Sequence, residues 1–250
     1  MPETIVTQAI VLRAVATGES DLVVNMLGRS TGRISAIARS ARKSTRRFGG
    51  GLGLAATGTA TVRERPGAEL AFLENFEVAR GRHGFGADLG STAQAGYVSE
   101  LCDQLCAPRQ ADVAVYDWLE EFLDALDDRG PSAVRLRAFE LGLLQRLGLG
   151  SDFASCVACG RRDLGDEVVR LEPERGGITC PGCARRGTPL PPDVRRALVD
   201  LRDLSLGAAE QLAPSREINL ACRAAVVELF APHLIRPLKS LEFLRKLQGG

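Results

Sequence analysis

The chain lacks the motifs on which many enzymes depend. Its 250 residues include two histidines, His83 and His233, and neither belongs to a His-Glu-x-x-His pattern or stands beside an obvious nucleophile. A G-x-x-x-x-G-K-[ST] phosphate loop is also missing, which argues against an autonomous ATPase. These absences favour a protein that binds its partners and is not an enzyme.

Long apolar segments are missing as well. No apolar signal segment follows Met1, and no stretch is apolar enough to span a bilayer. We therefore expect a protein of the reducing cytoplasm with no membrane contact. The composition, 45% hydrophobic and 25% charged with a net charge of +1, is that of an ordinary globular protein with room for two small domains.

Acidic residues are absent between Leu22 and Val62, where seven basic residues occur: Arg29, Arg33, Arg39, Arg42, Lys43, Arg46 and Arg47. Residues 81–130, by contrast, hold 3 Lys and Arg against 10 Asp and Glu. An uncompensated basic cluster is tolerated when water solvates it or when a polyanion neutralises it. A solvated loop is the simpler interpretation, and nucleic acid is the one that we favour. Phe48, which follows, could stack on a base or plug the local core.

Four cysteines form two C-x-x-C pairs, Cys156 with Cys159 and Cys180 with Cys183. Each pair offers two sulfurs from one tight turn, and two such turns complete a tetrahedral zinc shell. Four thiolates leave no open position for water, so we expect a structural zinc and not a catalytic one. Two disulfides, or a thioredoxin-like redox pair, are the alternatives.

The remaining cysteines are predicted to be core residues. Cys102 and Cys106 share a helical stripe with apolar neighbours, and Cys222 lies at four-residue spacing between Ile218 and Val226.

The first eighty residues carry the pattern of a small β-barrel. Five short runs have strand composition or alternation: residues 5–12, 22–27, 33–38, 59–63 and 70–78. In the last run, Phe72, Phe76 and Val78 are expected on one face. Few helical segments separate the runs, which favours a five-stranded OB-fold over residues 1–80, with residues 39–47 as a strand end and exposed loop.

From residue 85 onward the apolar period becomes helical. Stripes at 98–105, 116–126, 136–147, 191–204, 218–230 and 239–247 predict helices. We therefore expect an α+β protein whose helical domain, residues 81–250, contains an inserted zinc module at about 151–187.

Several segments together resemble the RecO family of bacterial DNA repair and recombination mediators. Residues 18–22, 32–34 and 38–44 resemble its N-terminal signature, residues 137–141 its central helix and residues 238–241 its C-terminal helix. The paired C-x-x-C motifs resemble the zinc segment of those members that have one. The resemblance covers essentially the whole chain in order.

This resemblance implies a non-enzymatic mediator of the RecF pathway, associated with the nucleoid. Such proteins have an N-terminal OB-fold, bind single- and double-stranded DNA, anneal complementary strands and help to load RecA on SSB-coated DNA, usually with RecR. In this chain, charge then predicts phosphate contacts at Arg33, Arg39, Arg42, Lys43, Arg46 and Arg47, and Phe48 is a candidate for stacking on a base. The alternative function is a zinc-ribbon adaptor that binds proteins without touching DNA.

Overall fold

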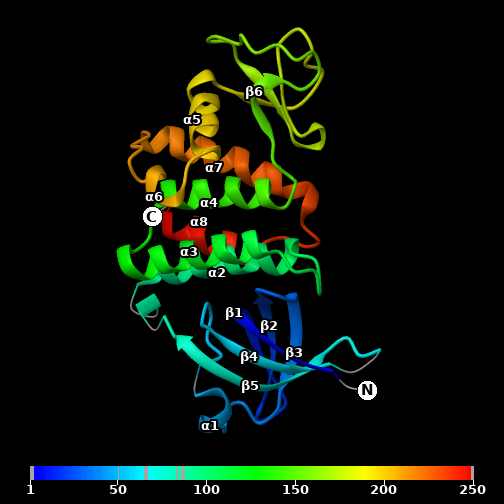
Figure 1. Cartoon of the computed structure of the whole chain (residues 1–250). Helices are drawn as coiled ribbons and strands as arrows, with labels where there is room; N and C mark the ends of the chain where they lie inside the picture. The colour runs from blue at the N-terminus through cyan, green and yellow to red at the C-terminus, as the bar shows by residue number, and fades with distance from the viewer. Residues whose placement is uncertain (1–2, 50, 65–66, 83, 86–87, 249–250) are drawn as a thin grey trace. The chain divides into compact units, whose positions relative to one another are not determined.

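The chain folds into two compact units. The computed structural model describes residues 3–49, 51–64, 67–82, 84–85 and 88–248, and Figure 1 traces them. The first unit comprises Met1–Pro131 and Arg236–Gly250, and the second comprises Ser132–Ile235. The predicted domain boundary at residue 80 coincides with the end of a strand, whereas the first compact unit also takes in the helices up to Pro131 and the C-terminal segment.

A closed barrel of five strands opens the first unit (Figure 1), and it confirms the predicted fold class. The strands are β1 (Thr4–Thr17), β2 (Asp21–Gly28), β3 (Gly32–Ala38), β4 (Thr57–Arg63) and β5 (Ala71–Arg80). Around the barrel their order is β1-β2-β3-β5-β4, and β4 pairs with β1 to close it. The pairing of β3 with β5 is parallel, and the others are antiparallel. This is the OB-type arrangement that the five runs predicted.

The barrel core follows from alternation along the strands. In β3 every second residue is buried, because successive side chains point to opposite faces. The predicted face of β5 is wrong. A bulge leaves Glu74 without a partner, since Asn75 pairs with Thr61 and Leu73 pairs with Val62. The extra residue changes which side chains point inward, so Leu73 and Phe76 are buried.

The bulge turns Phe72 to the face opposite that of Phe76, and Phe72 is half-buried. Val78 keeps the face of Phe76, since both pair with β4 two residues apart, but it is 37% exposed. All three side chains were expected on one face. A bulge of this kind has no clear signal in the alternation of a ten-residue strand.

Besides the short helix α1 (Thr45–Phe48), the described part of the first unit contains the longer helices α2 (Leu89–Leu105), α3 (Val113–Arg129) and α8 (Lys239–Gln248). α2 packs against β1, β2, α3 and α8. Asp88 and Asp112 cap α2 and α3 by accepting hydrogen bonds from backbone N–H groups of their first turns. Cys102 and Cys106 are buried as predicted.

The second unit combines helices with a small sheet. Its helices are α4 (Ala133–Arg146), α5 (Pro192–Arg202), α6 (Leu206–Ala209) and α7 (Arg216–Phe230), with 3-10 turns η2 (Pro173–Arg175) and η3 (Ala231–His233). The strands β6 (Asp152–Cys156), β7 (Val169–Glu172), β8 (Gly177–Thr179) and β9 (Thr188–Leu190) form a sheet in the order β6-β8-β7-β9. Cysteine spacing predicted this module but not its sheet.

In the described part of the chain, no helix combines the length and the apolar character needed to cross a membrane.

Candidate functional sites

Five exposed basic side chains lie together along one segment of the barrel. We call this set the basic surface: Arg39, Arg42, Lys43, Arg46 and Arg47. Arg39 follows the end of β3, the next two residues lie in the loop, and the last two lie in the short helix α1 (Thr45–Phe48). The segment was expected to be a strand end and loop, and the structure adds this helix, which lies at one end of the barrel (Figure 1).

The turn between β1 and β2 holds this loop in place. Ser40 adopts a left-handed backbone conformation with φ of 54°, and its N–H donates to the Asp21 carboxylate at 2.7 Å. The N–H of Arg42 donates to the Ser20 carbonyl at 3.1 Å, and its guanidinium donates to the Glu19 carbonyl at 3.1 Å. The Asp21 carboxylate thus binds a backbone amide of the loop and leaves the charge of the loop's basic side chains to solvent or a ligand.

Arg33 does not belong to the basic surface, which corrects the prediction from charge. Its Nε donates to the carbonyl of Cys106 at 3.1 Å, and its Nη1 lies 3.7 Å from the Asp103 carboxylate of α2. Only 20% of the side chain is exposed. Arg29 is likewise paired, with Asp117 of α3 at 2.9 Å. Acidic side chains of α2 and α3 therefore neutralise Arg33 and Arg29, the two basic residues that precede the basic surface in the sequence.

The prediction that Phe48 stacks on a base is also wrong. Phe48 is 1% exposed and belongs to the core of the barrel, so it plugs the core and cannot stack on a base. Phe72 on β5 lies on the outside instead. The guanidinium carbon of Arg39 lies 4.8 Å from the centre of its ring, and that of Arg63 lies 5.7 Å away. Charge and alternation could not reveal this cluster, because it depends on the bulge in β5.

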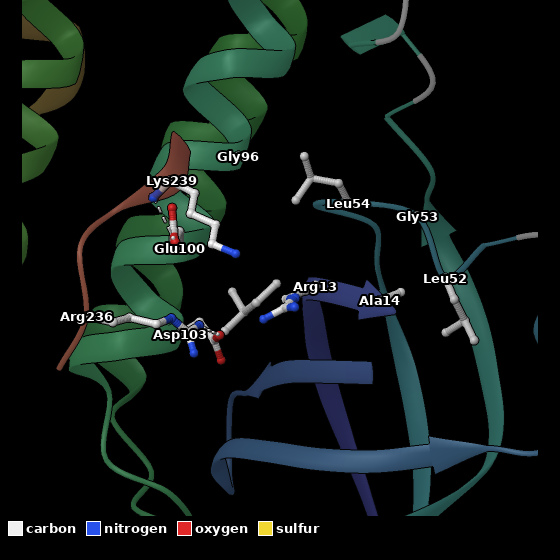
Figure 2. Close-up of a pocket in the computed structure, with 11 residues that line it drawn as sticks. Arg13, Ala14, Leu52, Gly53, Leu54, Gly96, Glu100, Asp103, Arg236 and Lys239 are labelled. Atoms are coloured by element: carbon white, nitrogen blue, oxygen red, sulfur yellow. Dashed lines mark hydrogen bonds and ion pairs between the residues drawn. The ribbon is translucent and has the colours of Figure 1, made fainter. Parts of the chain in front are cut away.

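A second basic site is a cavity of about 620 Å³ within the first unit. Figure 2 shows Arg13 of β1 and Lys239 of α8 directed toward one another across it. Arg236 also lines it and lies 3.5 Å from Asp103. The Glu100 carboxylate accepts hydrogen bonds from the N–H groups of Lys239 and Ser240, the first residues of α8. Sequence reasoning missed this site because its residues come from four separated segments.

The four predicted cysteines converge in the second unit. The sulfurs of Cys156, Cys159, Cys180 and Cys183 all lie within 4.8 Å of one another, and those of Cys159 and Cys180 are 3.9 Å apart. A tetrahedral zinc with Zn–S bonds of about 2.3 Å holds its sulfurs about 3.8 Å apart. The arrangement therefore fits a four-thiolate metal centre. All seven cysteines are free thiols, which removes the disulfide alternative.

The sheet explains why the two pairs meet. Cys156 is the last residue of β6 and Cys180 follows β8, and these two strands are parallel neighbours. Parallel strands end at the same edge of a sheet, so both C-x-x-C turns begin there. The N–H of Cys180 also donates to the Cys156 sulfur at 3.3 Å.

The thiols of the cluster differ in how readily they ionise. Burial opposes the thiolate of Cys156, but backbone N–H groups of Cys180, Ala158 and Cys159 outweigh it and lower the pKa of Cys156 to about 6. Hydrogen bonds with Cys159 and Cys180 raise the pKa of Cys183 to about 12. Four thiolates this close repel one another, and a bound cation removes that repulsion.

The other ligand types add no further centre. Within the described ranges, the four-cysteine group is the one set of histidine, cysteine and acidic side chains with metal-binding geometry. His233 lies outside it, and His83 falls outside the described residues. Cys222 is buried as predicted, and this burial raises the pKa of its thiol to about 11.

Comparison with known proteins covers nearly the whole chain. Residues 1–82 match the family model "Recombination protein O N terminal", and residues 86–242 match "Recombination protein O C terminal". The chain is 41% identical over 243 residues to the DNA repair protein RecO of Anaeromyxobacter sp. strain K, covering 95% of this chain and 94% of that protein. It is 34% identical over 242 residues to the RecO of Myxococcus xanthus, covering 96% of each, and 32% identical over 240 residues to that of Geobacter sulfurreducens, covering 96% and 97%. The chain therefore belongs to the RecO family of DNA repair proteins.

Proposed function

We propose that this protein binds DNA through the basic surface of its barrel and acts as a recombination mediator in repair. One observation carries the proposal. Among the residues that the structure describes, the five side chains of the basic surface are exposed and none forms an ion pair with a carboxylate. Such cations gain most when they neutralise phosphates and release the counterions of DNA.

The chemistry of the surface fits both forms of DNA. Contacts to phosphates carry no sequence information, so the same side chains bind single strands and duplexes. A surface that screens the repulsion between two strands also favours their annealing. No bond is made or broken in such a reaction, so the proposed protein is not an enzyme. The wider role follows the family: loading of RecA on SSB-coated DNA together with RecR, in the cytoplasm at the nucleoid.

We also propose zinc as the metal of the four-cysteine centre. Soft thiolates in tetrahedral spacing favour zinc over hard cations such as Mg²⁺ and Ca²⁺, and four of them complete its shell. Bound zinc would tie the two C-x-x-C turns together, and Cys156, Cys159, Cys180 and Cys183 would hold it. Its role is then structural.

Charge reversal tests the DNA proposal. The variant carrying Arg42→Glu, Lys43→Glu and Arg46→Glu leaves Arg47, which donates to the Arg39 carbonyl at 2.6 Å, in place. We expect its affinity for a labelled single strand and for a duplex, measured by fluorescence anisotropy at low salt, to fall by about tenfold or more.

The matched control is Arg216→Glu, which reverses an exposed arginine on α7 of the second unit. It should bind DNA as the wild type does, and all variants should keep the wild-type circular dichroism and metal content. Unchanged DNA affinity in the triple variant would refute the proposal and favour the protein-binding adaptor.

A further inference from the structure

The barrel carries a hollow beside the basic surface that has the chemistry of a nucleotide site. Its volume is about 340 Å³, and it is lined by Arg39, Arg47, Arg63, Phe72, Leu73 and Glu74. Two of these, Arg39 and Arg47, belong to the basic surface. Arg63 and Glu74 neutralise each other through an ion pair of 2.7 Å. The free positive charge of the hollow thus comes from the two arginines that also face the proposed DNA path.

Phe72 supplies an aromatic face in this hollow. The bulge at Glu74 turns its ring outward, away from the core that holds Leu73 and Phe76. The Arg39 guanidinium lies over the ring at 4.8 Å, so a cationic group and an aromatic face are already in place beside each other. Bases stack on both aromatic rings and guanidinium planes.

A base can replace Arg39 as the group that stacks on the Phe72 ring. An exposed contact between an arginine and an aromatic ring is weaker than the stacking of a base on that ring. When a nucleotide enters, the Arg39 side chain can leave the ring and pair with the phosphate of the same nucleotide, a charge-assisted contact. Arg47 is held nearby by its hydrogen bond to the Arg39 carbonyl and offers a second cation.

We infer that the Phe72 hollow binds one unstacked base of single-stranded DNA and gives the barrel a preference for single strands over duplex. The inference rests on the proposed DNA binding by the basic surface and deepens it. In a duplex the faces of each base are covered by its neighbours, so the ring has nothing to stack on. Phosphate contacts alone cannot make this distinction, because both forms of DNA offer phosphates.

Substitution of Phe72 tests the inference. Phe72→Leu keeps an apolar side chain and removes the aromatic face, and Phe72→Tyr restores that face. We expect Phe72→Leu to weaken binding of an oligo-dT strand by about 5- to 100-fold, with binding of a long duplex unchanged. Phe72→Tyr should bind the strand as the wild type does. Val78→Ala, which alters another exposed apolar residue of β5, is the matched control and should change neither affinity.

An abasic strand of the same length completes the experiment, because it keeps the phosphates and lacks the bases. The wild type should bind it more weakly than oligo-dT, and Phe72→Leu should bind both alike. If Phe72→Leu binds oligo-dT as the wild type does while the triple charge reversal abolishes binding, the Phe72 site is wrong and the proposed function stands. If the wild type binds none of these strands, the proposed function fails and the Phe72 site fails with it.

Discussion

Individual arginines of the first unit differ in how deeply they are buried and in which acceptors surround the guanidinium. The side chain of Arg82 is fully buried, and it donates to the Ala55 carbonyl and the Thr57 hydroxyl and pairs with Asp124. Burial of a guanidinium is tolerated only with such a set of acceptors. Arg33 lies between the extremes, half-buried and bound to α2. Arg42 and its neighbours on the basic surface remain exposed. Residue type alone therefore does not show which guanidinium is available to a ligand, and the acceptors around each guanidinium do.

At the residue scale, the cap of α2 predicts a pH dependence. Hydrogen bonds from Ser91 and Gly90 lower the pKa of Asp88 below its ordinary value of 3.8. Because the folded-state pKa is the lower one, the carboxylate contributes stability above about pH 4, and this contribution is lost as the pH falls through the folded-state value. We expect Asp88→Asn, which retains a neutral cap, to have a lower thermal midpoint than the wild type at pH 7.

The difference between the two midpoints should shrink as the pH is lowered from 5 to 3. A difference that stays constant over this range would show that the charge of Asp88 does not stabilise the helix.

At the scale of elements, the cysteine module is built on short strands. Its strands β6, β7, β8 and β9 have five, four, three and three residues. Strands this short form few ladder hydrogen bonds, whereas a structural zinc supplies apparent binding free energies of about 10–16 kcal/mol. The hydrogen bond from Thr179 to the buried Glu172 adds one further link between β8 and β7. The metal is therefore expected to decide whether this element folds.

Metal removal tests that expectation. A chelator should make the chain susceptible to proteolysis within residues 151–187, while the barrel keeps its structure and DNA affinity falls only secondarily. Cys159→Ser, which alters an exposed ligand, should lose the metal as judged by elemental analysis. Cys102→Ala, which alters a buried cysteine outside the cluster, should retain it.

Unchanged protease resistance after chelation would contradict a structural metal. Direct loss of DNA affinity, with the barrel and the module both folded, would instead place the cysteine module in the DNA interface.

At the scale of the whole molecule, a net charge of +1 conceals an uneven distribution. Residues 1–80 carry 11 Lys and Arg against 7 Asp and Glu, and residues 81–130 carry 3 against 10. Some of these opposite charges neutralise each other within the first unit, where Asp103 pairs with Arg33 and Asp117 pairs with Arg29. The basic surface keeps its charge for a polyanion, and electrostatic attraction from so small a group of charges depends strongly on salt.

The slope of log K against log salt therefore measures how many phosphates the protein neutralises. Five cations, each neutralising one phosphate of a single strand, predict a slope of log K against log salt of about −3.5, from about −0.7 per contact. Lys43→Gln should make the slope shallower by about 0.7. Arg33→Gln should leave the slope unchanged and lower the thermal midpoint, because the Arg33 guanidinium is already held by the Cys106 carbonyl and by Asp103 of α2.

Binding measurements between 50 and 300 mM salt would decide between these outcomes. A flat salt response in the wild type, or a shallower slope in Arg33→Gln, would contradict the assignment of contacts.

Much of the architecture could be read from local patterns. Alternation over residues 59–63 predicted β4, and helical stripes predicted α2, α3, α4, α5, α7 and α8, because a buried face imposes its period on the chain. Spacing predicted the four cysteines as one centre, because each C-x-x-C turn brings its own two sulfurs together. The sheet around them had no such signal, since three- and four-residue strands are too short to show a period.

The sequence by itself determined the barrel strands, the longer helices, the two C-x-x-C pairs and the acid-free basic segment, because each depends on neighbours along the chain. Only the tertiary structure decided which of those basic residues stay free and which aromatic ring faces outward. Arg33 is satisfied by an acid seventy residues away, and one extra residue in β5 turns Phe72 outward while Phe48 fills the core. Such pairings depend on packing between distant segments, and no local pattern records them.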